Sequence, residues 1–235
     1  MRLDKFLVEQ GFFESRNRAL DAIKRGKVFV DGMVAKASYK CDEKTTIDID
    51  KEKFYVSRAA KKLELFLEEY PMELKEKRAL DIGSSTGGFV QILLENGAKS
   101  VACVDVGSNQ LHYSLRDNKQ VDIFEETDIR DFKPTEGFDV VTCDVSFISI
   151  LQIVDAIDLL AKSDMILLFK PQFEVGRNVK RDSRGVVVNR EAIAEAKEKF
   201  EAKTAKLHWI LCYETASKLA GKSGNIEYIY HFRKL

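Results

Sequence analysis

The chain has 235 residues, enough for one large and one small domain, and its Lys plus Arg balance its Asp plus Glu at 38 each. This balance excludes a global basic field, so any nucleic-acid surface must come from local clustering of charge. The longest apolar run, 165–169, is far too short to span a membrane, and the N-terminus lacks the apolar core of a secretory signal. The four cysteines are scattered without metal-ligand spacing. We therefore expect a monomeric protein of the reduced cytoplasm, with no metal and no membrane partner.

The first 50 residues predict a separate small α+β module. Apolar residues at helical spacing follow Met1, and Ser15 is placed to cap a second helix that closes at Gly26. An alternating strand at 28–30 then meets Asp31-Gly32, which is typical of a two-residue hairpin turn. A further short strand is expected at 47–49.

The charges of this module are unusual. Arg16 and Arg18 occupy the first turn of the second helix, where the helix dipole disfavours cations unless a phosphate binds there. Residues 1–40 carry nine Lys or Arg against five Asp or Glu, so the module is locally basic. A solvated helix face is the alternative interpretation, and charge alone does not decide between the two.

Residues 51–59 predict a linker, because the sequence K-E-K-F-Y-V-S-R has no helical period. Ser57 is placed to cap the helix that follows, which carries an apolar stripe over 63–70. Lys61 and Lys62 flank this stripe. Taken alone, they indicate solvated lysines that pair with nearby glutamates.

Residues 79–89, A-L-D-I-G-S-S-T-G-G-F, predict a strand, a glycine-rich turn and a helix, the opening of a doubly wound α/β nucleotide site. Ser85 replaces the glycine of a dinucleotide fingerprint, and Phe89 replaces the lysine of a Walker loop. The acidic strand end then favours a ligand with an amino group and a ribose, which indicates S-adenosylmethionine. An ordinary tight strand–helix connection is the alternative. The expected cofactor-binding residues of this stretch are Asp81, Gly83, Ser84, Ser85, Gly87, Gly88 and Phe89.

Four further strands are expected, at 100–106, 121–124, 138–143 and 165–169. Asp105 lies about twenty residues past the glycines, where an acidic group binds ribose hydroxyls. In an open parallel sheet, ligands bind beyond the carboxyl ends of the strands, and polar residues cluster there. The residues expected at that edge are Asp81, Asp105, Asp144 and Lys170, and Asp128 follows the 121–124 strand as another cofactor contact.

The stretch 176–190 is basic and irregular, which favours a substrate-binding loop. A helix is expected at 191–203, and strands at 207–213 and 226–232 flank a loop. Glu227 lies early in the last of these strands.

The N-terminal module resembles the alpha-L RNA-binding module through R-L-D-K-F-L and S-R-N-R-A-L-D-A-I-K-R-G-K-V-F-V-D-G. This resemblance implies that the second helix and the hairpin hold structured RNA. The implied phosphate contacts are Arg16, Arg18, Lys24, Arg25 and Lys27.

The whole chain resembles the TlyA family of ribosomal RNA ribose methyltransferases, historically labelled hemolysins. The residues that carry this resemblance are Y-V-S-R-A-A-K-K-L at 55–63, D-I-G-S-S-T-G-G-F at 81–89, D-V-S-F-I-S at 144–149 and F-K-P-Q-F-E-V-G at 169–176. The implied organisation is an RNA-binding domain at 1–50, a linker at 51–59 and an FtsJ-like, Rossmann-like methyltransferase domain at 60–235.

FtsJ-type 2′-O-methyltransferases carry a Lys-Asp-Lys-Glu set, and the resemblance implies that the set here is Lys62, Asp144, Lys170 and Glu227. Lys62 is preferred over Lys61 because Leu63 follows it. A ribose hydroxyl must lose its proton as it attacks, and a neighbouring cation favours a neutral amine, so Lys170 beside Lys62 is the expected base. Asp144 would hold Lys170 and the hydroxyl, and Glu227 would fix Lys62. The RNA contacts expected outside the N-terminal module are Arg58, Arg177 and Arg184.

The expected activity is S-adenosylmethionine-dependent 2′-O-methylation of a cytidine in ribosomal RNA within ribosomal subunits. The resemblance implies 23S rRNA as the main target, with 16S rRNA as a second target in longer family members. Two alternatives are a ribosome-binding RNA chaperone with an inactive methylase half and a membrane-active hemolysin. Both are disfavoured, because the glycine turn and the catalytic set are intact and no stretch can span a bilayer.

Overall fold

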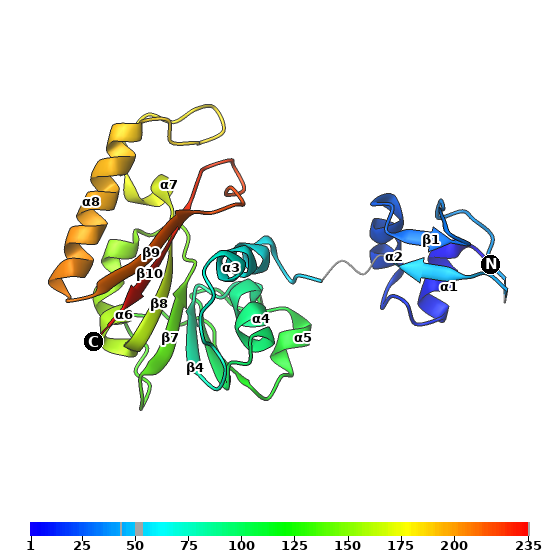
Figure 1. Ribbon diagram of the computed structural model, residues 1–235, viewed down its shortest axis with the longest axis horizontal. Coiled ribbons are helices and arrows are strands. Elements are labelled where there is room, and N and C mark those ends of the chain that lie inside the picture. Colours follow the sequence, from blue (N-terminus) through cyan, green and yellow to red (C-terminus); the bar gives the residue numbers. More distant parts are fainter. Residues whose placement is uncertain (43, 50–53, 235) are drawn as a thin grey trace. The chain divides into compact units, whose positions relative to one another are not determined.

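The computed structural model describes residues 1–42, 44–49 and 54–234, and the chain divides into two compact units, Met1–Phe54 and Tyr55–Leu235 (Figure 1). Residues 51–53 of the expected linker lie outside the described residues. At the other end of that linker, Arg58 and Ala59 already belong to a helix, because Ser57 is its extended N-cap residue at φ −157° and ψ 170°. The second unit therefore begins before the expected residue 60.

The first unit packs two helices against a three-stranded antiparallel sheet of order β2-β1-β3. Its elements are α1 Leu3–Glu9, α2 Arg16–Lys24, β1 Val28–Val30, β2 Met33–Val34 and β3 Ile47–Ile49. Asp31 and Gly32 both have positive φ, 50° and 82°, as a two-residue turn between right-twisted strands requires. The predicted hairpin is confirmed.

The second unit contains a seven-stranded sheet of order β6-β5-β4-β7-β8-β10-β9, in which β10 runs antiparallel to both of its neighbours and the other pairs are parallel (Figure 1). This arrangement confirms the predicted α/β class. The strands are β4 Arg78–Ile82, β5 Ser100–Val104, β6 Val121–Phe124, β7 Phe138–Cys143, β8 Ala161–Phe169, β9 Ile210–Ala216 and β10 Tyr228–Arg233.

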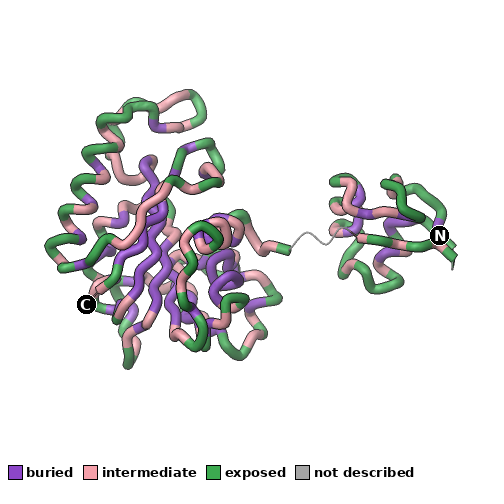
Figure 2. The backbone as a smooth tube through the Cα atoms, in the orientation of Figure 1, coloured by how far each residue is buried: buried purple, intermediate pink, exposed green. Residues whose placement is uncertain are grey.

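Helices cover both faces of this sheet, so its five inner strands are buried along most of their length, whereas the edge strands β6 and β9 are more exposed (Figure 2). One face packs against α3 Arg58–Glu69, α4 Gly88–Glu95 and α5 Tyr113–Arg116. The other packs against α6 Val154–Leu160 and α8 Arg190–Lys206. Two short helical segments, η1 Ile150–Gln152 and α7 Pro171–Glu174, follow β7 and β8 at the carboxyl edge of the sheet.

Several strand boundaries differ from the sequence-based expectation, and β5 ends at Val104, two residues before the expected end. β8 begins at Ala161, four residues earlier than the apolar run indicated, because its polar start pairs with β7 and with the end of β10. β9 begins at Ile210 because His208 has a φ of 60° and turns the chain after α8. β10 begins at Tyr228, so Glu227 precedes the strand. The short helices α5, α6 and α7 were not predicted, since so few turns leave little periodic signal.

Helices α3 and α4 approach each other most closely at Gly88. A Cβ atom at this position would lie 2.2 Å from Ser57 Oγ and 2.7 Å from the Ala60 backbone nitrogen. Both are far inside van der Waals contact, and the second neighbour is backbone that cannot rotate away. Glycine is therefore required at the start of α4 for packing, apart from any role in ligand binding.

We expect Gly88→Ala to lower the free energy of unfolding. Alanine gains about 1 kcal/mol in helix propensity, but an overpacked contact costs about 1–3 kcal/mol, and here the contact is with backbone. Urea unfolding of the variant measures the difference. Ser57→Ala, added to Gly88→Ala, relieves only the overlap with the hydroxyl, so the double variant should remain less stable than the natural protein. A raised unfolding midpoint for Gly88→Ala would contradict this packing.

Candidate active site

Four charged side chains from four different elements lie at the carboxyl edge of the large sheet. Asp144 and Lys170 directly follow the parallel strands β7 and β8. β10 is antiparallel, so its beginning lies at the same edge, where Tyr228 pairs with Phe169. Glu227 is thereby placed beside Lys170. Lys62 projects from α3.

These side chains form two ion pairs. Lys170 Nζ lies 2.6 Å from Asp144 Oδ1, and Lys62 Nζ pairs with Glu227 Oε2. Every one of the four side chains is at most 14% exposed. Burial raises the pKa of the Asp144 carboxyl, and the charges of Lys170 and Lys62 oppose this rise. The structure thus brings the four predicted residues together as a buried, charge-balanced set.

The pairing differs from the expectation that two lysines crowd each other. Each ammonium pairs with its own carboxylate. The negative charge of Glu227 therefore offsets the positive charge of Lys62 and reduces its effect on Lys170. Buried charges are stable only when paired in this way. The charged group that interacts most directly with the Lys170 ammonium is therefore the Asp144 carboxylate.

Two neighbours that the sequence interpretation did not single out add hydrogen bonds to the set. Lys170 Nζ donates to Ser146 Oγ at 3.0 Å, and Gln172 Nε2 donates to Glu227 Oε1 at 3.0 Å. Both lie inside stretches that carried the resemblance, D-V-S-F-I-S and F-K-P-Q-F-E-V-G. Each is a polar residue two positions after a charged member of the set, and this spacing was the sequence signal that could have identified them.

Glu174 links the loops that follow β7 and β8. Its carboxylate accepts hydrogen bonds from Ser149 Oγ at 2.5 Å and from the Ile150 backbone nitrogen at 2.9 Å. One loop carries Asp144 and the other carries Lys170. The Glu174 carboxylate therefore holds the two loops, and with them the ion pair, in a fixed relation.

Phe147 stands out on the same loop as Asp144. Its φ is 68°, which is rare for a bulky residue, and its side chain is 92% exposed. Among the described aromatic contacts, the ring pairs with Phe173, tilted by 55° at 5.3 Å between centroids. A strained backbone that exposes an aromatic ring beside buried charges is typical of a functional surface.

The glycine turn between β4 and α4 has the conformation that its sequence predicts. Gly83 and Gly87 have φ values of 77° and 88°, and a Cβ atom at Gly83 would lie 3.1 Å from Val145. Beyond the turn, Asp105 accepts backbone hydrogen bonds from Ser85 and Gly107, both at 2.8 Å. Each of its carboxylate oxygens keeps a further lone pair for a ligand.

Other expected cofactor residues lie inside the fold. Asp81 belongs to β4, is 1% exposed, and accepts a 2.7 Å hydrogen bond from Thr142 Oγ1. Ser84 and Phe89 are also buried, and the Ser84 hydroxyl donates to the Asp81 carbonyl. Asp128 is held by the Arg130 guanidinium, which lowers the pKa of this carboxyl to about 2.

The expected RNA contacts lie on both units, and most of the arginines already have protein partners. Arg16 pairs at 2.5 Å with the buried Asp4, and this contact is the main reason why the pKa of Asp4 falls to about 2. Arg18 pairs with Glu14 at 3.2 Å, and Arg25 pairs with Asp21 at 2.9 Å. Arg16 therefore has a structural role at the start of α2. Its charge, which the sequence interpretation paired with a bound phosphate, is paired with Asp4.

In the second unit, Arg58 donates to the Ala220 carbonyl at 2.8 Å and so holds the loop before Glu227. Arg184 pairs with Asp182 at 3.2 Å. The backbone carbonyl of Arg177 accepts a hydrogen bond from the Arg181 guanidinium. These three arginines remain exposed, as do Lys180 and Arg190 of the basic loop.

Comparison with known proteins identifies both units. Residues 55–234 match the FtsJ-like methyltransferase family, and residues 1–47 match the S4 domain. The chain therefore has the organisation of an FtsJ-like methyltransferase with an N-terminal S4 domain.

Relatives match the chain over its whole length. The 23S rRNA (cytidine-2′-O)-methyltransferase TlyA of Campylobacter jejuni is 47% identical, with all of both chains covered. The 16S/23S rRNA (cytidine-2′-O)-methyltransferase TlyA of Mycobacterium tuberculosis is 37% identical over 99% of this chain and 89% of the relative. A solved structure described as a hemolysin from Streptococcus thermophilus is 34% identical, with a TM-score of 0.73, and the match covers this whole chain and 88% of that one. The chain belongs to the TlyA family of FtsJ-like methyltransferases.

Hemolysin A of Brachyspira hyodysenteriae is also 37% identical over 99% of both chains. Within the described ranges of this chain, no helix is long and apolar enough to cross a membrane.

The buried Asp81 carboxyl predicts a particular pH dependence of stability. Desolvation is the main cause that raises its pKa from 3.8 to about 7, so the folded protein holds a proton that the unfolded chain releases. The natural protein should therefore lose stability relative to Asp81→Asn as pH rises from about 4 to about 7, by up to about 4 kcal/mol. Asparagine keeps an acceptor for Thr142 and cannot ionise.

Urea unfolding of both proteins at several pH values across this interval measures the difference. A constant difference between them would show that Asp81 is ionised throughout.

Proposed function

We propose that this protein transfers a methyl group from S-adenosylmethionine to the ribose 2′-hydroxyl of a cytidine in 23S ribosomal RNA. The observation that carries the proposal is the buried set of two Lys–carboxylate pairs beside the glycine turn. Such a set can bind a hydroxyl, orient it and accept its proton. A methylase acting on a base nitrogen needs no comparable pair of lysines.

The cofactor proposal rests on the residues around the turn. Asp105 offers carboxylate lone pairs for a ribose diol, and Gly83 and Gly87 allow a ligand to approach the backbone closely. The Ser57 hydroxyl is buried against Gly88 and has no hydrogen-bond partner among the described residues, so a polar donor remains at the start of α4. When bound, S-adenosylmethionine supplies the methyl group, whose bond to sulfur breaks as the bond to oxygen forms.

The catalytic residues act on the hydroxyl. The ribose oxygen forms the new O–C bond while its proton passes to Lys170, which must first release the ammonium proton of its ion pair to solvent, and Asp144 holds the resulting amine in line. Burial raises the pKa of Asp144. This buried carboxyl therefore binds a proton more tightly than an exposed carboxyl does, which brings its proton affinity closer to that of an amine. Lys62, fixed by Glu227, orients the same hydroxyl.

The proposed target follows from the relatives. The Campylobacter jejuni relative matches this chain over the full length of both and is named for 23S rRNA alone, whereas the Mycobacterium tuberculosis relative, named for both RNAs, is longer. The S4 domain supplies affinity for the RNA in this proposal. The basic loop at 176–190 and the exposed Phe147 ring would then contact the nucleotides around the target ribose.

We expect Lys170→Ala to lower the single-turnover rate of methyl transfer to 23S rRNA by about 100- to 10,000-fold, because a positioned base is lost. Cofactor affinity by calorimetry and RNA affinity should change little. Lys170→Arg should fail as well, because a guanidinium keeps its proton.

An active Lys170→Arg variant would instead assign Lys170 an electrostatic role. Mass spectrometry of the product nucleosides tests the reaction itself. A methyl group found on a base, or no transfer by the natural protein, would refute ribose methylation.

The S4 domain should contribute RNA affinity without chemistry. Lys24→Ala is the suitable variant, because Arg16→Ala would strip a buried carboxylate of its partner and destabilise the unit. Its affinity for 23S rRNA should fall and the salt dependence should weaken by about one counterion. The exposed Lys199 on α8 provides the control variant Lys199→Ala. Equal losses in both variants would indicate only a general charge effect.

A further inference from the structure

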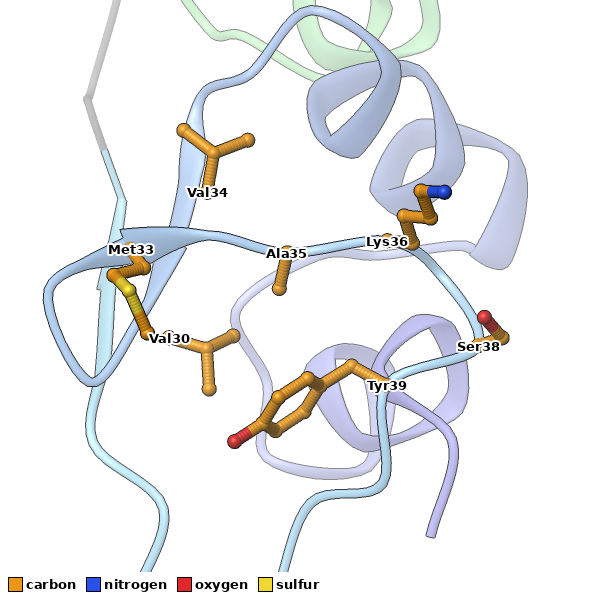
Figure 3. Close-up of a pocket in the computed structure, with 7 residues that line it drawn as sticks. All are labelled: Val30, Met33, Val34, Ala35, Lys36, Ser38 and Tyr39. Carbon is orange, nitrogen blue, oxygen red and sulfur yellow. The ribbon is translucent and has the colours of Figure 1, made fainter.

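A hollow of about 330 Å³ opens on the first unit beside the β1–β2 hairpin (Figure 3). Val30, Met33 and Ala35 form its apolar wall, and the ring of Tyr39 is turned toward Val30 and Ala35. Lys36 also lines the hollow, and in Figure 3 its side chain extends from the same loop in the direction away from the Tyr39 ring. This volume lies near the lower limit for small-ligand sites, about 300–1,000 Å³, and suits a single planar ring system.

The apolar side chains of the hollow are unusually exposed. Met33 is 72% exposed, Val34 58% and Tyr39 43%. None of the three belongs to the hydrophobic core of this unit or packs against it, as far as the described residues show. A cluster of exposed apolar side chains on a small domain marks an interaction surface.

The loop that carries Tyr39 lies beside the start of α1. It is held there by hydrogen bonds from the backbone nitrogens of Leu3 and Asp4 to the Tyr39 and Ala37 carbonyls. Arg2 and Arg16 both bind the Asp4 carboxylate and are about half exposed. Lys36 is the charged residue among those that line the hollow, and Arg2 and Arg16 add positive charge elsewhere on the same unit. This combination of cations with an aromatic and apolar hollow matches a nucleobase with its attached phosphate better than an apolar peptide, which needs no cations.

We propose that this hollow binds one unpaired nucleobase of the RNA substrate. The base stacks on Tyr39 against Val30 and Met33, and the adjoining phosphate contacts Lys36. The site rests on the proposed function only in that the bound macromolecule is RNA. The other contacts expected in this domain are with phosphates. The hollow would add a contact with the base of an unstacked nucleotide.

The test is the affinity of the full chain for protein-free, transcribed 23S rRNA over a range of salt concentrations. Tyr39→Ala should raise Kd by about 5- to 150-fold, the effect of losing one base–aromatic stack, and should leave the salt dependence unchanged. Tyr39→Phe should bind like the natural protein. Lys36→Ala should weaken binding and reduce the salt slope by about one.

Phe12→Ala is the matched control. Phe12 is an aromatic residue of the same unit, 44% exposed against 43% for Tyr39, and it does not line the hollow. Its removal should leave Kd unchanged. Equal losses in Phe12→Ala and Tyr39→Ala would overturn the proposal, because the effect would then not belong to the hollow.

Binding to intact ribosomal subunits separates RNA from protein as the occupant. If Tyr39→Ala weakens binding to intact subunits but not to protein-free RNA, the hollow holds a protein segment and the proposal fails. Ribose methylation by the natural protein is measured in the same samples. A natural protein that methylates, with an unaffected Tyr39→Ala variant, overturns the nucleobase site alone. A natural protein that neither binds nor methylates RNA overturns the proposed function together with the site.

Discussion

The buried ion pair between Lys62 and Glu227 is the contact on which the site depends. It joins the first helix of the large unit to the start of its last strand, 165 residues apart in the chain. Each buried charge alone would cost several kcal/mol, so neither residue is tolerable there without the other. The antiparallel direction of β10 allows the contact, because this strand begins at the edge where β7 and β8 end and where Asp144 and Lys170 follow them.

Much of this arrangement could be predicted from the sequence, because a polar residue that directly follows an apolar run marks the carboxyl end of a parallel strand. Asp144 and Lys170 were predicted at one edge on this ground, and the strand at 138–143 was located to the residue. The glycine turn and the Asp31-Gly32 hairpin were equally clear, since both require positive φ and glycine allows it. Lys62 and Glu227 were assigned only through family resemblance, because local pattern contains no information about a contact between distant elements.

What could not be predicted depends on partners that are distant in the sequence. The pairing of each lysine with its own carboxylate, the hydrogen bonds from Ser146 and Gln172, and the link through Glu174 appear only when the loops after β7 and β8 lie together. In the first unit, Arg16 was expected to hold a phosphate, and its pairing with the buried Asp4 was not foreseen. A cation at a helix N-terminus can thus be explained by an internal anion, and local sequence does not distinguish the two.

The central claim is that the four buried charges act as one unit on a ribose hydroxyl. A double-mutant cycle on single-turnover methyl transfer, with Lys62→Met, Glu227→Gln and the two combined, tests it most directly. Residues that act as a unit are strongly non-additive, so the account predicts that the double variant is no slower than the slower single variant. Losses that multiply in the double variant would contradict the account, because Lys62 and Glu227 would then contribute independently.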